Sequence, residues 1–264
     1  MSLARKVQNF KKILLPQKKV ENGSQHDRVL NQKTDFFVKE AYKALRTNLI
    51  FSLPDQGGKV VLVTSACAGE GKSLNCMNIA ISFAETGAKV CVVDCDMRKP
   101  NVARLNNEKG SPGLSNVLVH INELDDVIKK SAYPNLDLIF SGDIPPNPAE
   151  LLTSSKMDEV CDILVSRYDY VFIDTPPVNV VTDVSLLAGK ANGVLLVVRQ
   201  GQTTKEDLAD AVHQLQFIKT RILGVLLNDI KMVGRKKSYK YRYRYRYSGA
   251  YYVRNFVEET EKNG

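Results

Sequence analysis

Residues 60–87 read VVLVTSACAGEGKSLNCMNIAISFAETG, and this stretch determines the kind of fold that the chain can adopt. Its first six residues form an apolar run rich in β-branched side chains, which predicts a buried strand. Residues 73–87 predict a helix that ends at Gly87, because glycine is common just after a helix. A glycine-rich turn between a strand and a helix directs backbone N–H groups toward one point, and this arrangement binds phosphate oxygens.

The turn itself, SACAGEGKS at residues 65–73, fits the GxxxxGK[ST] pattern of phosphate loops, except that Ala66 replaces the first glycine. Gly69 and Gly71 carry no side chain, so the backbone can approach a phosphate closely. We expect Lys72 to reach the outer phosphates of ATP and the Ser73 hydroxyl to bind Mg²⁺. The predicted ATP-binding residues of this loop are Ala68, Gly69, Glu70, Gly71, Lys72, Ser73 and Leu74.

Two later strands also carry acidic residues at their ends. Residues 89–96 include Asp94 and Asp96, and residues 168–177 include Asp174. The carboxyl ends of parallel strands face the ligand crevice, so we expect all three acids near the phosphate loop. Asp94 and Asp96 share one side if the chain stays extended, and such a pair favours a metal ion or a shared proton. The alternative is a solvated loop.

Strands and helices alternate through the centre of the chain. Further apolar runs at 136–140, 193–200 and 222–229 predict strands, and the segments 184–190 and 204–220 predict helices. Near-continuous apolar strands separated by helices are typical of parallel sheets covered on both faces. The predicted fold class is therefore α/β, a three-layer P-loop NTPase with a mostly parallel central sheet.

The sequence divides into three segments. Residues 1–33 predict a mobile basic arm, residues 34–230 the P-loop domain with a helix at 34–51, and residues 231–264 a flexible tail. Apolar residues at positions 7, 10, 13 and 14 leave open a short membrane-surface helix within the arm, although a solvated arm is favoured.

Charge and composition exclude several classes of protein. The net charge is +8, but residues 1–20 hold six Lys or Arg and residues 231–246 hold eight, so the remainder carries about −6. No apolar run approaches the roughly 20 residues that span a bilayer, and the N-terminal residues lack the features of a signal peptide. Cysteines and histidines show no metal-ligand spacing. We therefore expect a cytoplasmic protein without disulfides or zinc.

The order of SACAGEGKS, VVDCDMRKP, YDYVFIDTPP and a tyrosine-rich tail resembles the bacterial tyrosine kinases of capsular and exopolysaccharide synthesis. The resemblance is to their free-standing, cytosolic Gram-positive form and covers about residues 35–252. Its other shared stretches are EAYKALRTNLIF (40–51), GLSNVL (113–118), SGDIPPNPAELL (141–152) and DTPPVNVVTD (174–183).

The resemblance implies an ATP- and Mg²⁺-dependent protein-tyrosine kinase. In that reading Asp94 is the catalytic base, Lys72 binds phosphate, and Asp96 assists catalysis. Ser73, Asp96 and Asp174 hold Mg²⁺. Generic P-loop ATPases lack several of these shared stretches, so the set is specific.

The resemblance also implies residues for adenine and for assembly. Asn228 follows the last strand, where related ATPases recognise adenine, and Glu40, Lys43 and Arg46 match a helix that docks into a neighbouring subunit of a ring. Cys67 stands where partitioning and septum-site ATPases carry a second, cross-subunit lysine. The alternative function, an ATPase of that type without kinase activity, is disfavoured for this reason.

The tail holds seven of the eleven tyrosines, most of them alternating with Lys or Arg. A strand would gather four like charges on one face, and a nucleic-acid arm is a second alternative. The kinase reading favours a substrate tail that neighbouring subunits phosphorylate. The predicted sites are Tyr239, Tyr241, Tyr243, Tyr245, Tyr247, Tyr251 and Tyr252.

The family resemblance implies partners as well. They are other copies of the chain, a membrane-anchored adaptor of the polysaccharide co-polymerase type, a cognate tyrosine phosphatase and other tyrosine-phosphorylated proteins. No nucleic acid is expected. The adaptor would recruit the enzyme to the inner face of the cell membrane.

Overall fold

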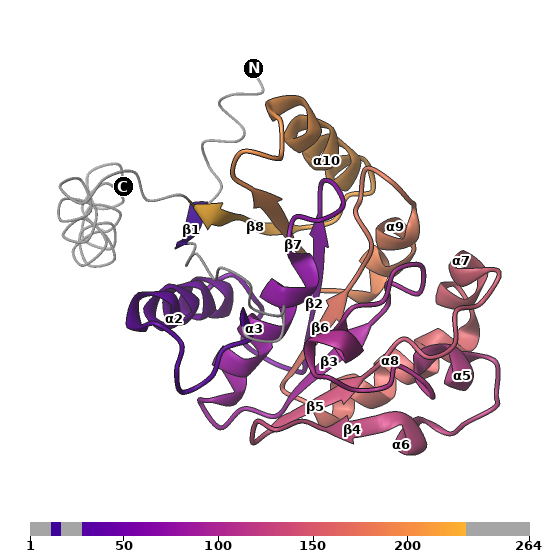
Figure 1. Ribbon diagram of the computed structural model, residues 1–264. Coiled ribbons are helices and arrows are strands. Elements are labelled where there is room, and N and C mark those ends of the chain that lie inside the picture. The colour runs from indigo at the N-terminus through magenta and orange to yellow at the C-terminus, as the bar shows by residue number, and fades with distance from the viewer. Residues whose placement is uncertain (1–11, 17–27, 231–264) are drawn as a thin grey trace, which may run out of the picture. The chain divides into compact units, whose positions relative to one another are not determined.

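The computed structural model describes residues 12–16 and 28–230, which form one eight-stranded sheet with helices on both faces (Figure 1). The strand order is β1-β8-β7-β2-β6-β3-β5-β4. Every neighbouring pair is parallel except β4 and β5, which are antiparallel. The strands are β1 (Lys12–Pro16), β2 (Lys59–Ser65), β3 (Val90–Asp94), β4 (Ile128–Lys130), β5 (Leu136–Ile139), β6 (Tyr170–Asp174), β7 (Gly193–Arg199) and β8 (Ile222–Ile230).

The helices connect these strands, and several begin with a side-chain cap. Asp35 accepts a hydrogen bond from the Phe37 N–H at the start of α2, and Thr204 forms a capping box with Asp207 at the start of α10. The helices are α2 (Phe36–Ile50), α3 (Lys72–Ala84), α4 (Val102–Leu105), α5 (Leu114–Leu118), α6 (Leu124–Val127), α7 (Pro148–Leu152), α8 (Ser155–Arg167), α9 (Asp183–Leu187), the 3₁₀ turn η2 (Ala188–Lys190) and α10 (Lys205–Phe217).

Alternate residues of the central strands belong to two separate cores, one on each face of the sheet. In β2, Val61 and Val63 belong to the core that includes residues of α2 and α3, whereas Val60 and Leu62 belong to the core that includes residues of α8, α9 and α10. Because the side-chain period of a strand is two and both faces are covered, the strands are apolar throughout. Phe83 of α3 packs against two rings of β6, with centroids 4.5 Å from Tyr170 and 5.1 Å from Phe172.

The structure confirms the predicted fold class. Each predicted strand and helix is present, with ends that differ by a few residues from the expected ranges. The two edge strands, β1 and β4, were not predicted. β1 lies in the segment expected to be a solvated arm or a membrane-surface helix, and it pairs with β8 instead.

The predicted limit of the arm at residue 33 is also wrong. Val29 and Leu30 are buried in the core. The Leu30 N–H donates to Asn78 Oδ1 at 2.8 Å, and the Tyr133 hydroxyl donates to the Leu30 carbonyl at 2.6 Å. An apolar pair within a polar stretch gives no periodic signal, so the burial of these residues is visible only in the tertiary structure.

The seven tail tyrosines lie outside the described residues. Within residues 12–16 and 28–230, none of the helices combines the length and the apolar character needed to cross a bilayer.

Candidate active site

The phosphate loop lies between β2 and α3, at the carboxyl edge of the sheet. Gly69 and Gly71 both have positive φ angles, 81° and 88°, which side chains other than hydrogen disfavour. Gly71 immediately precedes α3 and has no side chain to cap it. A Cβ atom at Gly71 would lie 2.4 Å from Asn228 Nδ2. Glycine is therefore required at this position both by the backbone angle and by the neighbouring side chain.

The Glu70 side chain points into the protein rather than toward a ligand. Its carboxylate is buried and accepts hydrogen bonds from the Cys67 N–H at 2.9 Å and from the Thr203 hydroxyl. Burial raises the pKa of Glu70, and these two hydrogen bonds partly oppose that effect. Glu70 thus links the loop to Thr203 through its buried carboxylate, a role that its position in the motif did not predict.

Lys72 lies against the strand-end acids. Its Nζ atom is 2.7 Å from Asp96 Oδ2 and 3.3 Å from Asp174 Oδ2, and it is 3.4 Å from the Ser73 hydroxyl oxygen. Burial lowers the pKa of Lys72, but the charges of Asp174 and Asp96 outweigh burial and raise it. The ammonium group is therefore charged at neutral pH. The structure brings together the residues that the sequence predicted for phosphate and Mg²⁺.

Asp94 is buried beside these groups but faces a different set of donors. β3 ends at Asp94, directly opposite Asp174 in β6. The Asp94 carboxylate accepts hydrogen bonds from three backbone N–H groups, those of Asp96 at 3.1 Å, Asn101 at 3.0 Å and Val102 at 2.9 Å. Burial, followed by the charge of Asp174, raises the pKa of Asp94 to about 7.

The chain does not stay extended after Asp94, so the condition under which Asp94 and Asp96 would share one side is not met. The backbone turns after Asp94 because its carboxylate binds the N–H groups of the turn that follows. Asp96 is left to contact Lys72. The two acids therefore occupy different environments, and the positive charge that stabilises Asp96 comes from Lys72 rather than from a metal ion or a shared proton.

The oxygen atoms near Lys72 fit a hard cation. Ser73, Asp96 and Asp174 all contact the Lys72 ammonium. Burial raises the pKa of Asp174, against the charge of Lys72 and a hydrogen bond from the Ser73 hydroxyl, both of which lower it. Mg²⁺ prefers oxygen ligands and is usually held by one or two carboxylates together with nucleotide phosphates. In the described part of the chain, no three His, Cys, Asp or Glu side chains form a metal site by themselves. The donor set thus suits a cation that arrives with a nucleotide.

Three side chains of the predicted assembly helix lie on α2. Glu40 and Lys43 form an exposed ion pair with each other at 2.8 Å. Arg46 instead donates to the Ser82 carbonyl and, at 3.2 Å, to the Ser82 hydroxyl on α3. Lys43 is therefore exposed and Glu40 half-buried, while Arg46 is bonded within its own chain. Their role in assembly stays a prediction.

Sequence reasoning missed the residues that follow β7. Arg199, Gln202 and Thr203 all contact the phosphate loop. Arg199 ends β7, and β7 pairs with β2, which leads into the loop. Knowledge of this strand order would have identified them, but the local sequence does not contain it.

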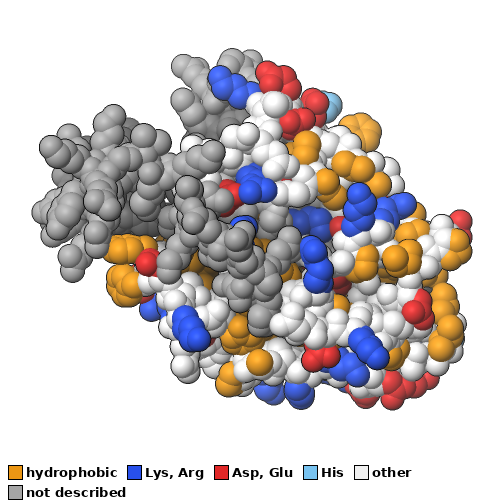
Figure 2. Space-filling view, in the orientation of Figure 1, with side chains coloured by type: hydrophobic (Ala, Val, Ile, Leu, Met, Phe, Trp, Pro, Cys, Tyr) orange, Lys and Arg blue, Asp and Glu red, His pale blue; other side chains and the backbone are white. Residues whose placement is uncertain are grey.

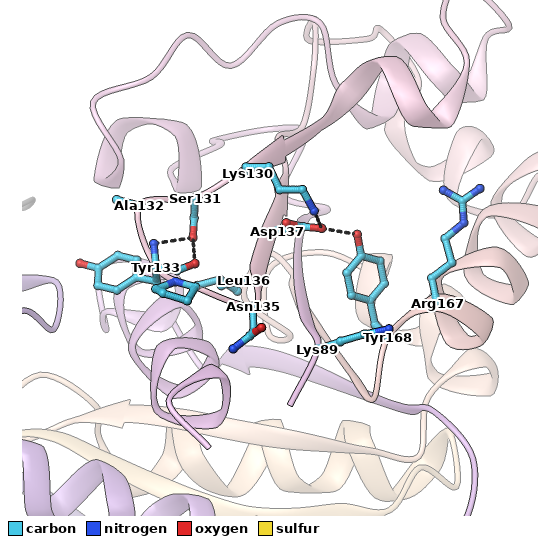
Figure 3. A pocket seen from close by; sticks show the side chains of 11 residues that line it. Lys89, Lys130, Ser131, Ala132, Tyr133, Asn135, Leu136, Asp137, Arg167 and Tyr168 are labelled. Carbon is cyan, nitrogen blue, oxygen red and sulfur yellow. Dashed lines mark hydrogen bonds and ion pairs between the residues drawn. The ribbon is translucent and has the colours of Figure 1, made fainter. Parts of the chain in front are cut away.

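A cavity of about 580 Å³ lies away from these residues, at the start of β5 and the end of α8 (Figure 3). Figure 3 shows Lys130 and Tyr168 pointing toward Asp137, with hydrogen bonds of 2.8 and 2.7 Å. None of the predicted site residues lines this cavity. On the face drawn in Figure 2, Lys and Arg side chains are interspersed with acidic and apolar ones rather than joined into one basic surface.

The sequence and the structure are both similar to those of known proteins. A protein-family profile described as an AAA domain matches residues 58–230. The tyrosine-protein kinase YwqD of Bacillus subtilis (strain 168) is 40% identical over 193 residues, which cover 73% of this chain and 81% of YwqD. The crystal structure of the chimerical protein CapA2B2 matches with a TM-score of 0.78 and 30% identity, over 86% of this chain and 97% of the chimera.

A more distant neighbour shares the fold alone. The cell division ATPase MinD of Pyrococcus furiosus matches with a TM-score of 0.55 and 22% identity, over 64% of this chain and 71% of MinD. The kinase similarity is stronger in both identity and coverage. The chain therefore belongs to the family of bacterial tyrosine kinases.

Proposed function

We propose that this chain is an ATP-dependent protein-tyrosine kinase that phosphorylates its own C-terminal tyrosine cluster between subunits. Through this reaction it would regulate capsular or exopolysaccharide synthesis and export. The observation that carries the proposal is the position of Lys72, which lies at the start of α3 within 3.3 Å of both Asp96 and Asp174. This juxtaposition is suited to bind a nucleotide triphosphate together with Mg²⁺.

The residues of the site divide the work of phosphoryl transfer. The loop N–H groups and Lys72 bind the phosphates, while Ser73, Asp96 and Asp174 hold Mg²⁺, which supplies neutralisation of the phosphate charge. Asp94, with a pKa raised to about 7, accepts the phenol proton of the attacking tyrosine. The tyrosine oxygen then forms a bond to the γ-phosphorus as the bond to the departing ADP breaks. Positioning and charge neutralisation supply most of the rate.

The tail is proposed as the substrate because of its composition. Residues 231–246 carry eight Lys or Arg and no acid, so the acids of the site attract them. We propose that the tail enters the site of a neighbouring subunit, so that transfer takes place within a ring. Each phosphate adds about −1.5 to −2 charge. A few phosphates would cancel the basicity of the tail and loosen the ring.

Partners follow from family membership. We propose a membrane-anchored adaptor of the polysaccharide co-polymerase type, which recruits a cytoplasmic enzyme to the inner face of the membrane, and a cognate tyrosine phosphatase. Affinity purification from membrane extract, with Lys72→Met protein as a second bait, tests the adaptor. We expect both baits to retain an integral membrane protein. Retention of none contradicts this part of the proposal.

The kinase itself is tested with labelled ATP and phosphotyrosine detection. Wild-type protein is expected to label itself, Lys72→Met is not, and the exposed Lys89→Met is a matched control that keeps activity. Release of phosphate to water without any phosphotyrosine would instead identify an ATPase of the partitioning type.

Transfer between subunits needs a separate mixing experiment. An active enzyme with all seven tail tyrosines changed to Phe is incubated with intact-tailed Lys72→Met. Labelling of Lys72→Met is expected. If it stays unlabelled while wild-type protein is active, transfer occurs within one chain.

A further inference from the structure

Three consecutive carbonyl groups of the phosphate loop accept hydrogen bonds from outside the loop. Gln202 Nε2 donates to the Ala68 carbonyl at 2.8 Å, and Arg199 Nη1 donates to the Gly69 carbonyl at 3.1 Å. Asn228 Nδ2 donates to the Glu70 carbonyl at 2.9 Å. These donors come from the end of β7, the loop that follows it, and β8. Two separate parts of the chain therefore hold three successive peptide units of the loop.

The orientation of these carbonyls has a direct consequence for phosphate binding. In a planar trans peptide, the C=O of one residue and the N–H of the next point in opposite directions. Fixing the carbonyls of residues 68, 69 and 70 therefore fixes the N–H groups of Gly69, Glu70 and Gly71 on the opposite side. Successive N–H groups aimed at one point form an anion-binding concavity. The side chains that bind the loop carbonyls from outside therefore determine the direction of the loop N–H groups that face a phosphate.

Arg199 is itself held in place by an acid at the end of β8. Its Nε atom donates to Asp229 Oδ2 at 2.7 Å, and its Nη2 atom pairs with the same oxygen. Asp229 has a φ angle of 63°, a left-handed conformation that is uncommon outside glycine. Such backbone conformations persist only where surrounding contacts enforce them. Asp229 also stands two residues before the tail segment that begins at residue 231.

We propose that Arg199, Gln202 and Asn228 form an outer clamp that orients the phosphate loop for nucleotide, and that Asp229 positions Arg199 within it. The inference rests on the proposed function only in that the loop binds ATP. The clamp residues are positioning residues, because the contacts that they make with the loop are to its carbonyl oxygens. This role for the Asn228 amide nitrogen is separate from the adenine contact predicted from the family resemblance.

The first experiment compares nucleotide affinity and turnover in full-length variants. The dissociation constant of fluorescently labelled ADP with Mg²⁺, the KM for ATP and kcat are measured for Arg199→Ala, Arg199→Lys and Gln202→Ala. Arg199→Ala is expected to raise the dissociation constant and KM together by about tenfold, with kcat within about twofold, because it removes binding shared by ground and transition states. Arg199→Lys should restore part of the affinity, since one ammonium group cannot satisfy both partners.

Arg167→Ala is the matched control, because Arg167 forms an exposed ion pair with Asp125 outside the site. It should leave all three constants unchanged. Thermal unfolding without nucleotide separates the clamp from a purely structural arginine. If Arg199→Ala lowers the unfolding temperature but leaves the ADP dissociation constant unchanged, the clamp is refuted. Arg199→Lys supplies the same comparison if the alanine variant does not fold.

A double-mutant cycle tests the role of Asp229. Asp229→Ala alone is expected to raise the ADP dissociation constant by about threefold, and it should add nothing in the Arg199→Ala background. Additive effects would overturn the positioning role. Wild-type protein that binds ADP but labels no tyrosine would contradict the proposed kinase function and leave the clamp standing, so the two failures are distinguishable.

Discussion

Replacing Gly71 by alanine tests whether the phosphate loop is fixed by its contact with β8. Gly71 has a φ angle of 88°, and an added Cβ atom would lie 2.4 Å from Asn228 Nδ2. Gly87, after α3, provides a matched control. Its φ angle is 90°, yet an added Cβ atom there meets nothing within 4 Å. The two substitutions therefore share the cost of the backbone angle and differ in the collision.

The magnitude follows from this comparison. A left-handed conformation costs a residue with a Cβ atom about 1–2 kcal/mol, and the loss of unfolded-state entropy offsets part of this equally at both positions. At Gly71 the Asn228 amide must also move, which breaks its 2.9 Å hydrogen bond to the Glu70 carbonyl. A hydrogen bond of this kind contributes about 1 kcal/mol. Gly71→Ala should thus lower the free energy of unfolding by about 1 kcal/mol more than Gly87→Ala.

Urea denaturation of both variants, each in wild-type and Asn228→Ala backgrounds, measures the difference. In the Asn228→Ala background the colliding amide and its hydrogen bond are already absent, so the excess cost at Gly71 should disappear. The ADP dissociation constant should rise for Gly71→Ala and stay unchanged for Gly87→Ala. Equal costs at the two glycines, or an excess that persists without the Asn228 amide, would refute the reasoning.

Three further outcomes are expected. Asp94 must be unprotonated to act as a base, and its pKa is raised to about 7, so kcat/KM for tyrosine phosphorylation should rise about tenfold per pH unit below pH 7 and level off above it. The residual activity of Asp94→Asn should not show this rise, and an Asp94→Asn profile that still rises below pH 7 rules out Asp94 as the base. Phe83 is buried, so Phe83→Ala should lower the free energy of unfolding, measured by urea denaturation, by about 3–5 kcal/mol. Phe217 is exposed, so Phe217→Ala should change this free energy little; similar losses for the two variants would contradict the packing described. Changing Glu40 and Lys43 together to alanine should alter the free energy of unfolding by less than about 1 kcal/mol but prevent ring assembly, as measured by analytical sedimentation. If the double variant still forms rings, neither residue is needed at the subunit interface.

The sequence was sufficient for the fold and for the principal charged groups of the site, because both depend on local patterns. Apolar strand runs predict buried parallel strands, and residues at the carboxyl ends of such strands meet at one edge. Lys72, Asp96 and Asp174 are close together for this reason. The turn after Asp94 was not predicted, because it depends on hydrogen bonds from the Asp94 carboxylate to backbone N–H groups as far along the chain as Val102.

The proposed clamp on the phosphate loop could not be predicted from local sequence patterns, because it depends on the order of the strands in the sheet. Arg199 reaches Gly69 only because β7 pairs with β2, and Asp229 reaches Arg199 only because β8 pairs with β7. Strand order is a property of the whole sheet, and apolar runs of similar composition do not encode which of them are neighbours. Residues that act across strands therefore appear only when the topology is known.

The contacts of Lys72 indicate how nucleotide and cation binding depend on each other. Its ammonium group neutralises Asp96 and Asp174, so turning it toward a phosphate leaves two buried carboxylates without their cation. Removing one partner from a buried ion pair costs several kcal/mol. That cost is avoided when a second cation takes over the carboxylates as Lys72 leaves them. We therefore expect the site to bind a nucleotide strongly only when a divalent cation arrives with it, as in magnesium-dependent phosphoryl transfer.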